Sequence, residues 1–196
     1  MSLLQQLLLL LFLYGFRSLL FATCKCKNDF INFVAVPRPP QADCPADIIF
    51  VVDDSRSIGA GNFDRVKSFL RQLVGRLDID SGRTKVGLVT FSSSVGTVIN
   101  LREHSTVSSL QLAISSLRYT GGGTDTARAL AYVRTTMLTS AAGDRSNVPN
   151  IVAVLTDGIS VDSRATVVSF HLSLKKQVLW FFYLFYFPTD RTFDKN

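Results

Sequence analysis

Residues 46–57 read ADIIFVVDDSRS, an apolar run that ends in a turn rich in acids and hydroxyls. The continuous apolar residues 48–52 are typical of a strand that is covered on both faces of a sheet. Asp53, Ser55 and Ser57 follow at the end of this strand, where open α/β sheets bind their ligands. Because all three offer oxygen, the pattern predicts a site for Mg²⁺, or alternatively Mn²⁺ or Ca²⁺, rather than zinc or copper. Taken alone, it also fits a polar turn that caps a helix.

Two further segments place hydroxyls and a carboxylate near the same position. Residues 119–126 read YTGGGTDT, a glycine-rich turn that offers Thr124 and Thr126. Residues 150–158 read NIVAVLTDG, a second buried strand that ends in Asp157. Each segment lies where a strand or loop meets a helix, so we expect both to reach the same rim of the sheet.

With these segments the chain resembles the von Willebrand factor type A domain. The metal-ion-dependent adhesion site (MIDAS) of that family combines D-x-S-x-S, a threonine in a glycine-rich loop and an aspartate in a T-D-G turn, and all three parts occur here in the family's order. The resemblance covers about residues 46–162, with weaker traces to about residue 177. The phrases PADIIFVVD, KVGLVTFS and GGTDTARAL are similar to the extracellular-matrix branch, meaning matrilins and the A domains of non-fibrillar collagens.

The resemblance implies a role for each candidate ligand. Ser55 and Ser57 would bind the metal directly, and Thr124 would bind it directly or through water. Asp53 and Asp157 would hold coordinated waters from outside. The remaining octahedral position would be left for a carboxylate of the ligand protein. Because neutral hydroxyls would surround the ion, residual positive charge would attract an incoming Asp or Glu.

Two variable positions of the motif carry charge. Asp54 and Arg56 stand among the candidate ligands, and neither removes one of them. Many family members have glycine at the position of Arg56. Arg56 is either a solvated surface arginine or a contact for an acidic partner.

Composition limits the other classes of function. At 196 residues with 47% hydrophobic content, the chain suits one globular domain with short extensions. The net charge of +6 is spread along the sequence without a basic stripe that alternates with aromatics, so we expect no nucleic-acid role. A serine hydrolase would need a base near Ser55, but His104 and His171 lie in segments that read as a loop and a helix surface. We therefore expect no enzymatic activity.

The residues before position 46 are predicted to precede this domain. Residues 1–23 read as a secretory signal peptide, with a signal anchor as the alternative, and we expect no membrane association after its removal. Residues 24–45 read as a linker with cysteine and proline. Secretion would place Cys24, Cys26 and Cys44 in an oxidising compartment. Because three cysteines cannot all pair within one chain, at least one thiol is free or pairs between chains, unless cleavage removes Cys24. Matrix A domains often have a cysteine at the position of Cys44 that pairs with a second cysteine beyond the last helix. The sequence has no such second cysteine, so Cys26 is a candidate partner for Cys44.

The apolar spacing across residues 46–187 alternates between strands and helices. Strands are expected at residues 48–52, 85–91, 97–101, 150–156 and 178–187, and helices at residues 63–77, with Asn62 as N-cap, 107–117, 126–138 and 163–177. Parallel strands joined by helices predict an α/β fold with a doubly wound, mostly parallel, Rossmann-like sheet. A hairpin turn at residues 92–96 predicts one antiparallel edge strand.

The carboxyl-terminal part departs from the family pattern. After the apolar run 178–187 only a polar tail, residues 188–196, remains, where the family would continue through another helix, an edge strand and a closing helix. We therefore expect a von Willebrand factor type A domain over residues 46–187 that is incomplete at its carboxyl end.

Together these features predict a secreted, extracellular adhesion or matrix-assembly module. It would bind a protein ligand, such as collagen or another matrix component, through the divalent cation and an Asp or Glu of the ligand. Two alternatives remain open: a structural module that assembles without the metal, and a truncated fragment without function.

Overall fold

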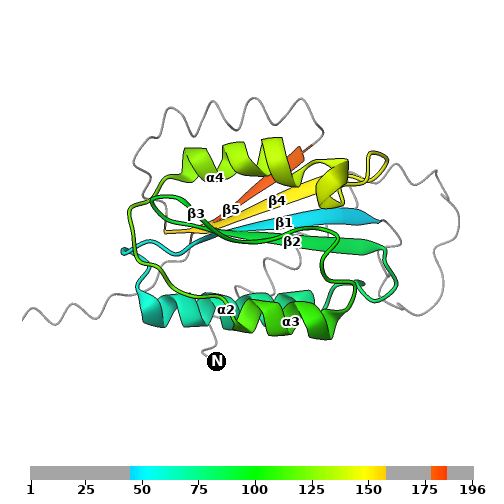
Figure 1. Cartoon of the computed structure of the whole chain (residues 1–196). Helices are drawn as coiled ribbons and strands as arrows, with labels where there is room; N and C mark the ends of the chain where they lie inside the picture. The colour runs from blue at the N-terminus through cyan, green and yellow to red at the C-terminus, as the bar shows by residue number, and fades with distance from the viewer. Residues whose placement is uncertain (1–44, 158–177, 185–196) are drawn as a thin grey trace, which may run out of the picture.

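The computed structural model describes residues 45–157 and 178–184, which contain one five-stranded sheet and its flanking helices (Figure 1). The elements follow in the order β1 (Ala46–Asp53), α2 (Ala60–Val74), β2 (Thr84–Phe91), β3 (Val95–Ile99), α3 (Val107–Ser115), α4 (Thr126–Tyr132), η1 (Val133–Met137), η2 (Ser140–Ala142), β4 (Asn150–Thr156) and β5 (Val178–Leu184).

The strands lie in the order β3-β2-β1-β4-β5, with β1 at the centre. β1 pairs in parallel with β2 and β4, β4 pairs in parallel with β5, and β2 and β3 form an antiparallel pair. This confirms the predicted, mostly parallel sheet with one antiparallel edge strand. The register aligns Asp53 with Phe91 and Val52 with Leu155, so the carboxyl ends of the three central strands meet at one edge.

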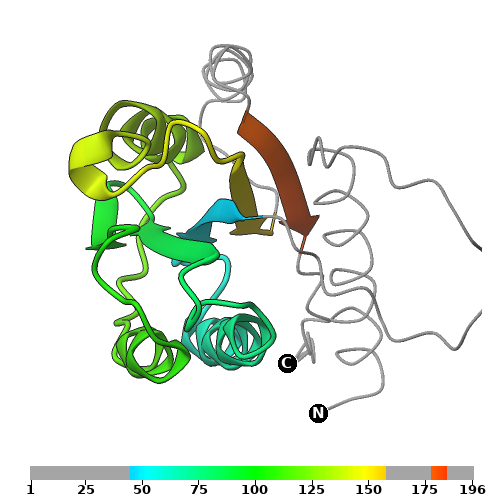
Figure 2. The same ribbon diagram turned by 90° about the vertical axis from the view of Figure 1, so that its right-hand side faces the viewer.

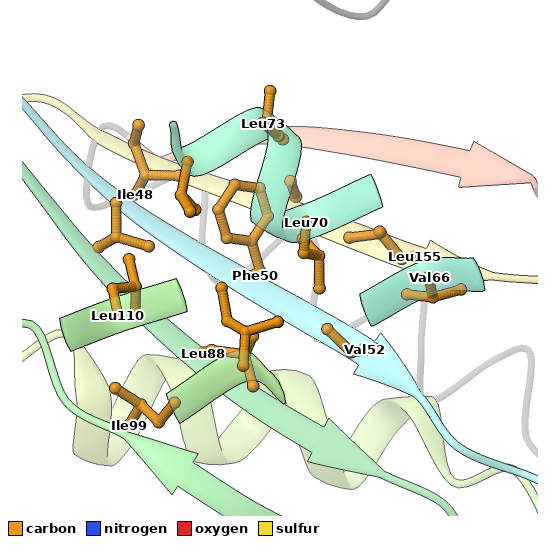
Figure 3. Close-up of a cluster of buried hydrophobic side chains, with 14 of the residues drawn as sticks. Ile48, Phe50, Val52, Val66, Leu70, Leu73, Leu88, Ile99, Leu110 and Leu155 are labelled. Carbon is orange, nitrogen blue, oxygen red and sulfur yellow. The ribbon is translucent and has the colours of Figure 1, made fainter. Parts of the chain in front are cut away.

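Helices cover both faces of the sheet, which is the predicted doubly wound arrangement. α2 and α3 pack side by side on one face, and α4 lies on the other (Figure 1, Figure 2). Because side chains alternate along a strand, Ile48, Phe50 and Val52 enter the core beneath α2 and α3 (Figure 3). Ile49 and Val51 enter the core beneath α4. Burial on both faces explains the uninterrupted apolar run of β1.

The start of α2 differs from its prediction. The helix begins at Ala60, and Gly59 precedes it without a side-chain cap, so the prediction of Asn62 as N-cap is wrong. The Asn62 side chain instead donates back to the Ile58 carbonyl at 2.9 Å. Gly59 has φ 74°, in the left-handed region that glycine adopts without steric cost, and this conformation lets the chain enter the helix three residues before the predicted start.

Other boundaries follow the predictions more closely. β4 matches the predicted strand at both ends, and β5 lies within the predicted run 178–187. β3 spans Val95–Ile99 rather than the predicted residues 97–101, so the hairpin turn is shorter and the strand ends two residues earlier than predicted. The predicted helix 126–138 changes at Val133, where α4 gives way to the π-helical turn η1.

Several predictions concern residues outside those that the structure describes. They include the signal peptide (1–23), the three cysteines, the helix at residues 163–177 and the polar tail (188–196). The domain limits 46–187 also stay a prediction. Among the described residues, no helix has the length and apolar character to cross a membrane.

The amino-terminal edge of the sheet contains a buried ion pair. Asp47, on β1, is fully buried, and Arg145 donates to its carboxylate through the main-chain N–H and through Nε, each at 2.8 Å. The same guanidinium donates to the carbonyls of Ala46, Gly82 and Arg83. Arg145 therefore neutralises a buried charge, and its hydrogen bonds connect the start of β1 with the segment before β2.

Candidate metal centre

The candidate ligands gather beyond the carboxyl end of β1. Asp53 is the last residue of β1 and is 1% exposed. Its Oδ1 accepts from the Ser55 main-chain N–H at 2.8 Å, which closes a tight turn that aspartate favours. Its Oδ2 accepts from the Thr156 hydroxyl, at the end of β4, at 2.7 Å. These bonds fix the carboxylate between the ends of two neighbouring strands.

The two serines of the motif turn their hydroxyls toward each other. Ser55 Oγ and Ser57 Oγ lie 3.0 Å apart. Ser55 is fully buried, whereas Ser57 is exposed, so the pair leads from the interior to the surface. The Tyr119 hydroxyl donates to the Ser55 carbonyl at 3.2 Å and thereby supports this turn from the loop that precedes the glycines.

The glycine-rich loop is held against the turn by main-chain hydrogen bonds. The Gly121 N–H donates to the Asp54 carbonyl at 3.0 Å, and the Arg56 N–H donates to the Gly122 carbonyl at 2.9 Å. Gly121 has φ 68°, in the left-handed region that favours glycine. At Gly122 a Cβ would lie 2.8 Å from Ser93 Oγ and 3.1 Å from the Ser93 main-chain nitrogen, so a side chain there would force the Ser93 hydroxyl or the loop to shift.

The last two candidate ligands lie on neighbouring segments. Thr124 follows the glycines and is 5% exposed. Asp157 directly follows β4 and is partly exposed. Because β4 pairs in parallel with β1, Asp157 lies at the same edge of the sheet as Asp53. The five predicted residues thus lie at one edge of the sheet, and their role as ligands stays a prediction.

A second buried carboxylate, Asp54, adjoins the site and is not among the predicted ligands. It is 1% exposed, and its Oδ2 accepts from the Thr120 hydroxyl at 2.8 Å. Its Oδ1 has no hydrogen-bond partner among the described residues. The Thr120 hydroxyl also contacts the Ser92 hydroxyl at 3.1 Å. No sequence pattern indicates these contacts, because Thr120 lies 66 positions from Asp54 and 28 from Ser92.

Burial makes both carboxylates unfavourable to ionise. It raises the pKa of Asp53, the charge of Asp157 raises it further, and the hydrogen bonds of Asp53 lower it. Burial likewise raises the pKa of Asp54 against the lowering effect of its hydroxyl neighbours. Within the described part of the chain, neither carboxylate forms an ion pair with a basic side chain. A positive charge at this edge would therefore be favourable.

The donor set fits a hard divalent cation. The candidate side chains offer only hydroxyl and carboxylate oxygens, and one buried Asp54 oxygen has no partner among the described residues. Across residues 45–157 and 178–184, no cluster of three or more His, Cys, Asp or Glu is arranged to hold a metal. An ion at this edge would thus depend on serine and threonine hydroxyls, which is chemistry that suits Mg²⁺, Mn²⁺ or Ca²⁺.

Comparison with curated proteins gives matrix proteins as relatives. The chain is 43% identical over 120 residues to the collagen alpha-4(VI) chain of Mus musculus, which covers 60% of this chain and 5% of the relative. It is 40% identical over 134 residues to matrilin-1 of Mus musculus, which covers 65% of this chain and 27% of the relative. The chain therefore corresponds to a small part of the length of these relatives.

Solved structures share the fold. Proximal thread matrix protein 1 from the mussel byssus has a TM-score of 0.67 at 27% identity, over 71% of this chain and 38% of that chain. A further structure of that protein, with a TM-score of 0.66 at 28% identity over the same 71% and 38%, has a zinc-occupied MIDAS motif. The von Willebrand factor type A domain model matches residues 47–183. Because this match spans more than half of the sequence, the chain belongs to the von Willebrand factor type A domain family.

Proposed function

We propose that this chain is a secreted extracellular-matrix module that binds a protein ligand through a divalent cation. The observation that carries the proposal is the pair of buried carboxylates, Asp53 and Asp54, which no basic side chain of the described residues neutralises. Oxygen atoms surround this uncompensated charge at the carboxyl edge of the sheet. A bound cation would stabilise the arrangement by supplying the opposite charge.

Ser55, Ser57 and Thr124 would hold the cation, and Asp53 and Asp157 would accept hydrogen bonds from its waters. When bound, the cation supplies positive charge that attracts a carboxylate of the ligand protein. The exposure of Ser57 leaves the site accessible from solvent. Oxygen ligands favour Mg²⁺, with Mn²⁺ or Ca²⁺ as alternatives, and the zinc-occupied motif of the mussel protein supports a divalent ion in this position.

The surface around the site supports an acidic ligand. Arg56 lies between the two serines, is exposed, and forms no ion pair within the described residues. Its main chain is fixed by the hydrogen bond to Gly122, so its guanidinium projects from a defined point of the rim. An arginine in this position favours a partner protein with several acidic residues. One of them would bind the cation, and another nearby would pair with Arg56.

The collagen and matrilin relatives support an extracellular location and a non-enzymatic role. The contact of Ser55 Oγ with Ser57 Oγ supports the same role, because a nucleophilic serine would need a base in that place. Collagen or another matrix protein is the partner class that these relatives favour.

Two measurements on the full chain test the proposal. Calorimetric titration with MgCl₂ and MnCl₂ tests the cation site without any ligand. Binding to immobilised collagen, with Mg²⁺ and with a chelator, then tests the ligand class. We expect both signals for the wild type and neither for Asp53→Ala. The control Asp64→Ala should keep both, because Asp64 is 71% exposed and its ion pair within the described residues is a surface pair with Lys67.

The outcomes separate the proposed function from its alternatives. Collagen binding that survives both the chelator and Asp53→Ala would contradict the proposal and favour a structural module that assembles without metal. A chain without any cooperative unfolding transition would point to a fragment without function.

A further inference from the structure

Two buried acids, Asp47 and Asp54, lie at opposite ends of β1 and differ in whether a basic side chain neutralises their charge. Asp47 is fully buried at the amino end, where Arg145 supplies an ion pair and several hydrogen bonds. Asp54 is equally buried just past the carboxyl end, where its Oδ2 accepts from the Thr120 hydroxyl at 2.8 Å and its described neighbours are hydroxyl and main-chain groups rather than a basic side chain. Its other oxygen has no partner among the described residues. Asp47 is therefore neutralised within the fold, and Asp54 is not.

The carboxylate of Asp54 is not needed to shape the turn in which it lies. Its main-chain N–H donates to the Phe91 carbonyl at 2.9 Å, and its carbonyl accepts from the Gly121 N–H at 3.0 Å. These bonds connect the turn to β2 and to the glycine-rich loop whatever the side chain is. A neutral side chain of the same shape would avoid the unfavourable burial of a charge. Burial of the Asp54 charge therefore costs stability, and no ion pair within the described residues offsets that cost.

We propose that Asp54 is a charge-supplying residue of the cation site, which weakens the cation-free fold and strengthens cation binding. The inference rests on the proposed function, because it assigns a second negative charge to the same site. Asp54 stands between Asp53 and Ser55, and little water separates buried groups, so its charge acts on a cation through a medium of low dielectric constant. Its effect would come from charge, without direct coordination.

The substitution Asp54→Asn tests this inference, because it removes the charge and keeps the shape. We expect the full chain carrying Asp54→Asn to bind Mg²⁺ and Mn²⁺ about tenfold more weakly than the wild type, or weaker still, in calorimetry at neutral pH. In chelator, its thermal midpoint should equal or exceed that of the wild type. A residue with a purely structural role would not produce these opposite changes.

Two control variants separate charge from structure. Asp47→Asn makes the same change in an equally buried acid at the far end of β1, so it should lower the midpoint in chelator and leave cation affinity unchanged. Thr120→Val removes the hydrogen bond that the Thr120 hydroxyl donates to Asp54 but keeps the Asp54 carboxylate. It should lower the midpoint in chelator and keep cation affinity close to that of the wild type.

Three results would overturn the inference. Asp54→Asn that binds the cations as tightly as the wild type would show that the charge does not act on the site. A lower midpoint of Asp54→Asn in chelator would show that the carboxylate stabilises the fold. If the wild type bound neither cation, both this inference and the proposed function would fail, whereas the first two results leave the proposed function standing.

Discussion

Single residues decide how closely the glycine-rich loop approaches the D-x-S-x-S turn. A Cβ at Gly122 would lie 2.8 Å from Ser93 Oγ and 3.1 Å from Ser92 Oγ. We expect Gly122→Ala to displace the loop, to cost about 1–3 kcal/mol of stability, and to weaken Mg²⁺ binding in calorimetry. The control Gly61→Ala, in α2, meets no atom within 4 Å and should raise stability by about 0.5–1 kcal/mol. Unchanged cation affinity in Gly122→Ala would contradict this account of the loop.

Tyr119 supports the serine turn through one hydrogen bond. Its hydroxyl donates to the Ser55 carbonyl at 3.2 Å, while its ring contacts that of Phe63 with centroids 5.9 Å apart. We expect Tyr119→Phe to keep the ring contact and to lose about 1 kcal/mol of stability in urea unfolding. Cation affinity should fall by a smaller factor than in Asp53→Ala, because the Ser55 hydroxyl itself remains. Stability equal to that of the wild type would show that this bond contributes nothing.

The sequence predicts the residues of the candidate site better than it predicts their supports. Asp53, Ser55 and Ser57 follow a buried strand within one short motif, and local spacing is enough to bring them together. The roles of Tyr119 and Thr120 depend on contacts with residues more than sixty positions away, which no local pattern encodes. Tertiary packing creates these supports.

Among the elements, β1 depends on a charge pair at its amino end. Arg145 joins Asp47 to carbonyls on the neighbouring segment, and the Asp47 carboxylate is fully buried. We expect Arg145→Met to cost about 3–5 kcal/mol, because it leaves a buried charge without its ion pair and with the main-chain N–H of residue 145 as the remaining donor from that residue. Lys67→Met removes a pair with the 71% exposed Asp64, a 3.4 Å hydrogen bond to the Leu117 carbonyl and a cation–π contact with Phe63, and should cost about 1–2 kcal/mol. Equal losses in denaturant unfolding would contradict the assignment of Arg145 as the principal charge partner of β1.

Strands and helices differ in how well their limits follow from the sequence. β4 is predicted to the residue, because burial on both faces makes its apolar run continuous and polar residues bound it. The first residue of α2 and the last residue of α4 are harder to predict from the sequence. α2 starts at Ala60 after an uncapped glycine, and α4 passes into a π-helical turn at Val133 within one amphipathic pattern. Apolar spacing alone does not distinguish these helical geometries.

In the whole molecule, the central strand β1 runs from an edge where a buried acid is paired with arginine to an edge where the buried acids form no ion pair within the described residues. Arg145 balances Asp47 at one end of β1, and Asp53 and Asp54 remain unbalanced by basic side chains of the described residues at the other. Domains of this size are stable by about 5–15 kcal/mol, so uncompensated buried charge is a large fraction of the total. Stability of the whole fold should therefore depend on the cation.

Thermal unfolding of the full chain, with and without millimolar Mg²⁺ or Mn²⁺, shows whether a divalent cation stabilises this fold. A cation at about a hundredfold above its dissociation constant stabilises the native state by about 2.7 kcal/mol, so the midpoint should rise by several degrees. Asp53→Ala should lose this rise, and Asp64→Ala should keep it. A wild-type midpoint that no divalent cation changes would contradict the account and leave a fold that works without metal.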